Sequence, residues 1–464
     1  MHLVMIGGSD AGISAALRAR ELDPGAEVSV IVADAYPNFS ICGIPYYISG
    51  EVTHWRNLAH RTTADLEATG MRLRLDTTAR RIDVPGRKLL VTAPDGHEEL
   101  LAYDKLIIGT GAVPVRPPIS GLDALGPDDG VHLLHSMGDT FAVMRTLEET
   151  DPATAVIVGA GYIGLEMADA LTTRGLQVIQ MEQLPEVLPT VDPALGALVH
   201  GQLTARGVEV LTGTTVRQIT RTDTGETGQV QVQVDATGAD GTAVTRLADM
   251  VLVVVGVRPD TTLAASAGAT LGPRDTIAVD RGMRTSLPDV YAAGDCVVTY
   301  HRLLGETYLP LGTTAHKQGR VAGENALGGN REFAGSLGTQ VVKIFDQAAA
   351  RTGLRDHEAA AAGYDPVTVH SGADDHKAYY PGSHRITMRF TGDRTTGRLL
   401  GVQLFGHRHA EIAKRVDIAA TAIFHSMTTD AVSDLDLSYT PPLGSPWEAI
   451  QMGAQAWLRE ASRP

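Results

Sequence analysis

The chain has 464 residues, of which 43% are hydrophobic, and its formal net charge at pH 7 is −15. A chain of this length forms two to four domains with a large buried core, so it needs neither disulfides nor a metal for stability. The acidic balance argues against a surface that binds nucleic acid or an anionic membrane.

Only two cysteines are present, Cys42 and Cys296, too few for a disulfide framework or a four-ligand zinc site. Such sparse use is typical of a reducing cytoplasm in which a thiol is kept for chemistry, so we expect a cytoplasmic protein without a metal site. Residues 1–12 lack a basic leader and pass directly into a glycine-rich turn, which indicates a buried strand and not a signal peptide. Short apolar runs at 155–161 and 250–257 cannot span a bilayer.

The N-terminal residues predict a βαβ unit. Its strand, turn, helix and second strand are expected at residues 2–6, 7–12, 13–22 and 27–32. The turn matches the pattern G-x-G-x-x-G at Gly7 and Gly12, with Ser9 in place of the middle glycine. A dinucleotide pyrophosphate would lie on the N-terminus of the helix, where free N–H groups favour anions. Asp34 is the acidic residue nearest to the position expected for a ribose ligand.

A second βαβ unit follows, with strands expected at 154–158 and 177–181 and a complete set of glycines. These are Gly159, Gly161 and Gly164. Glu182 ends the second strand, where a carboxylate accepts hydrogen bonds from ribose hydroxyls and repels a 2′-phosphate. We therefore expect NADH in preference to NADPH, with NADPH still possible. Two nucleotide-binding units imply two nucleotides, because hydride transfer from a nicotinamide to a flavin needs both.

Three further segments predict strands that end in turns. Residues 103–112 and 250–260 have the same shape, a buried strand followed by a glycine. In the third, 285–296, Asp295 ends a strand and precedes a helix within 310–326. An acidic side chain at this position could hold the sugar-alcohol chain of a flavin, with the helix N-terminus near the flavin ring.

Cys42 lies in the segment 36–51, YPNFSICGIPYYISGE, about thirty residues after the first glycine turn. We interpret it as a redox thiol placed against a flavin, and the alternative is a small buried hydrophobic residue. A helix beginning after Cys42 would favour the thiolate. Cys296, directly after an Ala-Gly-Asp sequence, is expected to be packed and inert.

Together these motifs resemble those of the pyridine nucleotide–disulfide oxidoreductase superfamily, and within it the single-cysteine branch of coenzyme A-disulfide reductases, NADH oxidases, NADH peroxidases and coenzyme A-persulfide reductases. The resemblance covers nearly the whole chain. It rests on GGSDAG, Cys42 with GIPYYISGE, GTGA, GAGYIGLE, GVRPD, VYAAGD and the C-terminal LSYTPPLGSPWEAIQMGA. A CxxxxC disulfide is excluded, since residues 38–47 contain one cysteine. The segment departs from the family pattern at Asn38, where the family usually has serine.

The resemblance implies an α/β fold with two Rossmann-like nucleotide-binding domains and an α+β C-terminal dimerisation domain. The FAD-binding domain is expected to be discontinuous, at residues 1–112 and 260–326. The NAD(P)H-binding domain is expected at 113–259 and the dimerisation domain at 331–464.

The resemblance also assigns roles to individual residues. FAD-binding roles fall on Gly7, Gly12, Asp34, Gly111 and Asp295. NADH-binding roles fall on Gly159, Gly161, Gly164, Glu182 and Tyr162, the last as a gate over the flavin. Glu166 would stand near the hydride path, and Cys42 would be the redox thiol.

In relatives a tyrosine of the partner chain completes the active site, and Tyr439 matches that tyrosine. Tyr380, or its neighbour Tyr379, matches the tyrosine of the family's YYP motif, with a core or interface role as the alternative. A phenol can donate a proton to a leaving thiolate.

Three basic residues are weaker candidates. Arg20, like Arg18, would meet the phosphates of coenzyme A, with a solvated helix face as the equal alternative. His316 could lie near the flavin, but a helix-capping or buried histidine is the expected role.

These residues predict a homodimeric FAD enzyme that uses NADH to reduce a small thiol-derived disulfide or persulfide through Cys42. One alternative is an NADH oxidase or peroxidase that reduces oxygen species through a sulfenic acid. Another is an NADH-responsive redox sensor or electron-transfer partner. Reduction of an inorganic metal or arsenic compound is a third, although mercuric-type enzymes use paired cysteines.

Overall fold

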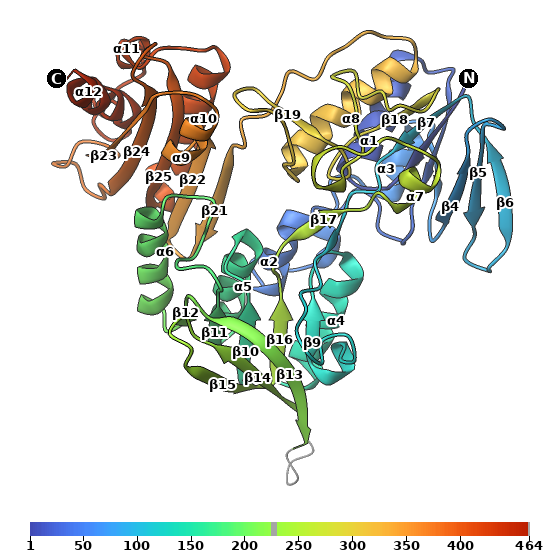
Figure 1. Cartoon of the computed structure of the whole chain (residues 1–464), viewed down its shortest axis with the longest axis horizontal. Helices are drawn as coiled ribbons and strands as arrows, with labels where there is room; N and C mark the ends of the chain where they lie inside the picture. The colour runs from blue at the N-terminus through green and yellow to red at the C-terminus, as the bar shows by residue number, and fades with distance from the viewer. Residues whose placement is uncertain (224–229, 463–464) are drawn as a thin grey trace. The chain divides into compact units, whose positions relative to one another are not determined.

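The computed structural model describes residues 1–223 and 230–462 (Figure 1). The chain divides into two compact units. Unit 1 comprises residues 1–115, 135–141 and 256–336, and unit 2 comprises the described residues of 116–134, 142–255 and 337–464. Among the described residues, none of the helices combines the length and the apolar composition that a transmembrane segment requires.

Unit 1 is built on a five-stranded parallel sheet in the order β18-β7-β1-β2-β3. Its strands are β1 (His2–Ile6), β2 (Glu27–Ile31), β3 (Arg72–Arg74), β7 (Lys105–Ile108) and β18 (Val290–Ala292). The central strand β1 is apolar and its Leu3, Val4 and Met5 are fully buried, as expected of a parallel strand covered on both faces.

Smaller antiparallel elements and short helices complete unit 1. The strands are β4 (Thr78–Asp83), β5 (Lys88–Thr92), β6 (Glu98–Ala102), β8 (Ala112–Pro114), β17 (Val257–Pro259), β19 (Thr299–His301) and β20 (Gly305–Thr307). The helices are α1 (Asp10–Leu22), α2 (Ile44–Ile48), α3 (Thr63–Ala68), α7 (Thr262–Ser266) and α8 (Gly312–Ala326), with 3-10 turns η1 (Ile41–Gly43) and η2 (Trp55–Leu58).

Helices α1 and α8 lie side by side, although some 300 residues separate them in the chain (Figure 1). Two glycines of α8 allow the close approach, since a Cβ on Gly319 would overlap the carbonyl oxygen of Ala11 and one on Gly323 that of Ala15. At the far end of the pair, Arg18 donates to the Glu324 carboxylate at 2.6 Å. The two halves of the discontinuous unit are thus joined through backbone-to-backbone packing of these helices.

Unit 2 contains a parallel nucleotide-binding-type sheet, a three-stranded antiparallel sheet and a five-stranded antiparallel sheet. The first has the order β12 (Glu209–Leu211), β11 (Gln177–Met181), β10 (Thr154–Val158), β16 (Met250–Val253) and β9 (Val131–Leu133). The second comprises β13 (Thr215–Asp223), β14 (Val230–Thr237) and β15 (Ala243–Ala248). The third has the order β21 (Gln340–Ile344), β22 (Gln347–Gly353), β25 (Leu399–His407), β24 (Arg385–Asp393) and β23 (Pro366–Asp374).

The helices of unit 2 include α5 after the second glycine turn, α6 after strand β11, and four helices that accompany the C-terminal sheet. They are α5 (Tyr162–Thr173), α6 (Pro193–Ala205), α9 (Asp356–Ala361), α10 (Ile412–Phe424), α11 (Thr429–Ser433) and α12 (Ala449–Ala461). Another helix, α4 (Met137–Glu149), begins in unit 1 and continues in unit 2. Trp457 anchors α12 to the edge of the C-terminal sheet, because its indole N–H donates to the Val367 carbonyl at 2.8 Å.

The two predicted βαβ units are confirmed, and strands β1, β10 and β11 have the predicted bounds. Helix α1 begins at Asp10 and not at Ile13. The Ile13 N–H donates to the Ser9 carbonyl at 3.0 Å, and this helical hydrogen bond makes the turn residues part of the helix. The buried strand and glycine turn predicted within 250–260 are confirmed as β16 and Gly256, which has φ +109°, and a further strand, β17, follows in unit 1.

We predict that Gly319→Ala lowers the free energy of unfolding by about 1–3 kcal/mol, because the new methyl group must push α8 away from α1. The matched control is Gly201→Ala in α6, where a Cβ would meet no atom within 4 Å and the extra methyl group favours the helix. Denaturant unfolding measures both. Equal midpoints for Gly319→Ala and the wild type would contradict the proposed packing.

Candidate active site

The first glycine turn has a backbone that only glycine accommodates at two positions. Gly7 has φ +113°, and a Cβ on Gly12 would overlap the Gly7 carbonyl oxygen. Ser9 is the N-cap of α1 and makes no side-chain capping hydrogen bond. The N–H groups of the first helical turn therefore point to a ligand position beyond the turn, which suits the diphosphate of a dinucleotide.

Three buried polar atoms on the elements around this turn have no hydrogen-bond partner within the described part of the chain. They are Asn38 Oδ1, the Tyr308 hydroxyl and Gln318 Nε2. Gln318 is tied to the same region, since its Oε1 accepts a bond from the Gly294 N–H at 2.9 Å. Because buried polar groups are normally satisfied, these atoms fit a site for a large ligand with many polar edges, such as FAD.

Asp295 follows strand β18 and stands at the N-terminus of α8, where its carboxylate accepts a bond from the Leu311 N–H. The pKa of Asp295 is raised to about 6, chiefly by burial and also by the negative charge of Asp10, while the bond from Leu311 opposes both effects. Gly111 has φ +71° and open space beside it. Asp34 is exposed beyond β2 and accepts a bond from the Tyr36 N–H at 2.9 Å.

Cys42 is exposed and lies in η1. The segment that carries it is bonded to the glycine turn, since the Asn38 N–H donates to the Gly8 carbonyl at 2.7 Å. Asn38 has φ +59° and accepts from the His60 N–H at 2.9 Å. These bonds hold the thiol-bearing segment against the proposed FAD turn.

The expectation that a helix begins after Cys42 is only partly met. Cys42 lies within a one-turn 3-10 helix, and the following α2 has five residues. Partial charges at a helix end grow from aligned peptide dipoles, so such a short helix stabilises a thiolate less than predicted.

Four aromatic rings support the thiol segment, an arrangement that sequence reasoning missed. Tyr36, Phe39, Trp55 and Phe141 have neighbouring ring centroids 5.3–5.8 Å apart. Edge-to-face and stacked ring pairs at these distances stabilise the fold by more than the burial of their surface area alone would give. Aromatic residues are only 5% of the chain, so their concentration near Cys42 was the available signal.

The second glycine turn repeats the first. Gly159 has φ +106°, and a Cβ on Gly164 would overlap the Gly159 carbonyl oxygen. A Cβ on Gly161 would meet no atom within 4 Å, so this glycine leaves space for a ligand. The buried Glu182 carboxylate accepts bonds from the Ala160 N–H at 2.8 Å and the Leu184 N–H at 2.9 Å. It thus also fixes the turn.

Tyr162 and Glu166 lie one turn apart at the start of α5, on the same helix face. The Thr190 hydroxyl donates to the Tyr162 hydroxyl at 3.3 Å. Burial raises the pKa of Tyr162, which keeps the phenol protonated.

The C-terminal tyrosines gather on an exposed surface of unit 2. Tyr439 is 45% exposed and Tyr379 is 73% exposed, and their hydroxyl groups form a hydrogen bond. Tyr380 instead places its ring 5.8 Å from the ring of His376. The phenol beside Tyr439 is therefore that of Tyr379, the alternative to the predicted Tyr380.

Arg20 and Arg18 do not form the solvated helix face considered from the sequence. Arg20 donates to the carbonyl oxygens of Thr69 at 2.8 Å and Ala26 at 2.6 Å. Arg18 pairs with Glu324. Two of the donor nitrogens of Arg20 are thus engaged by backbone carbonyls, and we do not include this residue in the substrate site proposed below.

Cys296 is fully buried, as predicted, and burial raises its pKa to about 11. Its thiol donates to the Ala293 carbonyl at 3.5 Å. The neutral thiol is a packed group and not a nucleophile.

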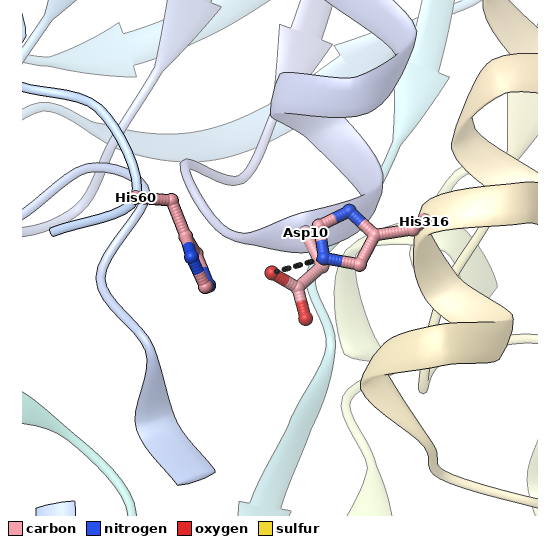
Figure 2. Close-up of side chains that lie close together, drawn as sticks. All are labelled: Asp10, His60 and His316. Atoms are coloured by element: carbon pink, nitrogen blue, oxygen red, sulfur yellow. Dashed lines mark ion pairs between the residues drawn. The ribbon is translucent and has the colours of Figure 1, made fainter. Parts of the chain in front are cut away.

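The prediction for His316 was wrong, because its side chain is 44% exposed and lies in the first turns of α8 without capping them. It lies near Asp10 and His60, which sequence reasoning missed because three distant segments supply the side chains (Figure 2). No local spacing signals this group.

Comparison with known proteins agrees with the two nucleotide turns and the C-terminal sheet. Residues 1–319 match the family model described as pyridine nucleotide-disulphide oxidoreductase, and residues 339–450 match the dimerisation domain of that family. An NADH oxidase of Methanocaldococcus jannaschii is 32% identical over the full length of both chains. A CoA-dependent NAD(P)H sulfur oxidoreductase of Pyrococcus furiosus is 33% identical over 97% of each chain.

Among solved structures, a NAD-dependent persulfide reductase from A. fulgidus has a TM-score of 0.91 and 35% identity. The match covers 99% of this chain and 83% of that one. The chain therefore belongs to the pyridine nucleotide-disulphide oxidoreductase family, whose cofactors are FAD and NAD(P)H.

Proposed function

We propose that this protein uses NAD(P)H and FAD to reduce a small thiol-derived disulfide or persulfide, such as coenzyme A disulfide, through Cys42. The observation that carries the proposal is the contrast between the two thiols. Cys42 is exposed on a segment bonded to the first glycine turn, whereas Cys296 is fully buried. Cys42 has no second accessible cysteine nearby in sequence, so its sulfur partner must come from the substrate.

The residues divide the work as follows. Gly7, Gly12 and the N-terminus of α1 would hold the FAD diphosphate, and Asp295 would hold the ribityl hydroxyls. Gly159, Gly161 and Glu182 would hold NADH. When bound, FAD accepts a hydride from the nicotinamide and passes two electrons to sulfur.

Cys42 performs the thiol exchange. Its thiolate attacks one sulfur of the substrate disulfide, a new S–S bond forms, and the other half leaves as a thiolate. Two electrons then cleave the mixed disulfide and regenerate the Cys42 thiolate. In sum, one NADH, one proton and one disulfide give NAD⁺ and two thiols.

Tyr439 would act across a homodimer as the group that protonates the leaving thiolate. Its hydroxyl is exposed and bonded to Tyr379, and both lie in the region matched by the family's dimerisation model. Leu443 and Trp447 are also exposed nearby in sequence, as expected for a surface that a second copy covers.

Glu182 supports a preference for NADH. Its carboxylate stands at the end of β11, where a 2′-phosphate would meet a negative charge. The relatives named above include proteins described with NADH and with NAD(P)H, so the preference is a property of this chain to be measured.

The second candidate function is an NADH oxidase that reduces oxygen through a Cys42 sulfenic acid. It is supported by the exposed thiol and by the full-length similarity to the M. jannaschii NADH oxidase. The proposed reduction of a disulfide or persulfide is supported by the higher sequence identity to the A. fulgidus persulfide reductase. It is also supported by the similarity to the CoA-dependent sulfur oxidoreductase of P. furiosus.

We predict that Cys42→Ser lowers turnover of NADH with coenzyme A disulfide by a factor on the order of 10³, about 4 kcal/mol, because a serine hydroxyl forms no disulfide. FAD content should not change. Anaerobic NADH consumption measures the effect, and Cys296→Ala is the control that should keep its rate. If the wild type consumes NADH rapidly only in air, the oxidase function replaces the proposed one.

We further predict that Tyr439→Phe lowers turnover about 100-fold without dissociating the dimer, because the general acid is lost. Mixed dimers of Cys42→Ser and Tyr439→Phe chains test whether the tyrosine acts across the dimer. One of the two sites would then combine Cys42 with the partner's Tyr439, so mixing should restore turnover. No gain on mixing would show that Tyr439 does not act in trans.

A further inference from the structure

We propose that Asp10, His60 and His316 form a binding site for one divalent transition-metal ion such as Zn²⁺. Their donor atoms all lie within 4.8 Å of one another, and all three residues belong to unit 1. Asp10 is in the first turn of α1, His60 precedes α3, and His316 is near the start of α8, so the site would join three separate segments (Figure 2).

The donor set is that of known metal sites. Two imidazoles and one carboxylate suit zinc and other first-row transition metals and leave open positions for water. Asp10 Oδ1 and His316 Nε2 are 3.2 Å apart. Bonds of about 2.0–2.1 Å at a tetrahedral ion place two donors about 3.3–3.4 Å apart, so this pair already has the required spacing.

A neighbouring hydroxyl orients His316. Ser14 is buried one turn after Asp10 on α1, and its Oγ lies 2.8 Å from His316 Nδ1. When the Nδ1–H donates to Ser14, the lone pair on Nε2 faces the Asp10 carboxylate. Two electron-rich atoms at 3.2 Å need a proton or a metal ion between them, and metal-bound histidines commonly have this kind of second hydrogen bond.

His60 supplies the third donor with little rearrangement. Its side chain is exposed, and its ring centroid is 6.2 Å from that of His316. Figure 2 shows the His60 ring on the side of Asp10 opposite His316. One of its ring nitrogens already lies within 4.8 Å of the donor atoms of Asp10 and His316, and its backbone is fixed by the bond from its N–H to the Asn38 carbonyl.

The local charge also favours a cation. The proposed FAD diphosphate would add a further anion at the N-terminus of α1. A divalent ion would offset the negative charges of the Asp10 carboxylate and of this diphosphate.

The test titrates the full-length, FAD-loaded protein with Zn²⁺ after chelator treatment, by calorimetry and by dialysis with elemental analysis. We expect one tightly bound Zn²⁺ per chain, with an affinity at least tenfold lower in His60→Ala and in Asp10→Asn. The same tight equivalent is expected in Cys42→Ser, in which the thiol cannot bind metal. FAD content is measured for every variant, and His60→Ala decides the test because its exposed side chain is not needed for folding.

The control variant is His409→Ala, which belongs to a separate group of rings formed by His384, His407 and His409. It should keep the tight equivalent. Loss of that equivalent in His409→Ala or Cys42→Ser but not in His60→Ala would overturn the proposal. The proposal would also be overturned if the wild type bound Zn²⁺ no more tightly than His60→Ala. The contact between Asp10 and His316 would then be only an ion pair between α1 and α8.

Discussion

The hydrogen bond from the Asn38 N–H to the Gly8 carbonyl is the contact on which the proposed chemistry depends. It ties the segment that carries Cys42 to the turn that would hold the FAD diphosphate. Asn38 has φ +59°, a conformation that asparagine tolerates better than most residues. The residue at which the sequence departs from the family pattern is thus the residue that anchors the thiol segment.

The two thiols differ in burial, and this difference indicates a chemical role for one and a packing role for the other. Cys296 is enclosed in the core of unit 1, where desolvation opposes the thiolate. Cys42 is exposed on a short turn supported by aromatic rings. Since the thiolate is the nucleophile, we propose that substrate reduction takes place at Cys42, the thiol that is exposed to an external disulfide.

The parts of the fold that depend on local backbone conformation could be predicted from the sequence. The glycines at 7, 12, 159 and 164 are required by backbone conformation or by close approach, and they signalled both nucleotide turns. What could not be predicted depends on contacts between distant segments. The Asp10–His60–His316 group, the backbone bonds of Arg20 and the pairing of Tyr439 with Tyr379 each join residues that no local spacing relates.

In the proposed function, substrate sulfur becomes covalently attached to Cys42. Mass spectrometry of the protein after incubation with coenzyme A disulfide tests it most directly. We predict that the peptide containing Cys42 gains the mass of one disulfide-linked coenzyme A, and that NADH under anaerobic conditions releases it. An unmodified Cys42 peptide, or an adduct that NADH leaves in place, would contradict the proposed role of Cys42.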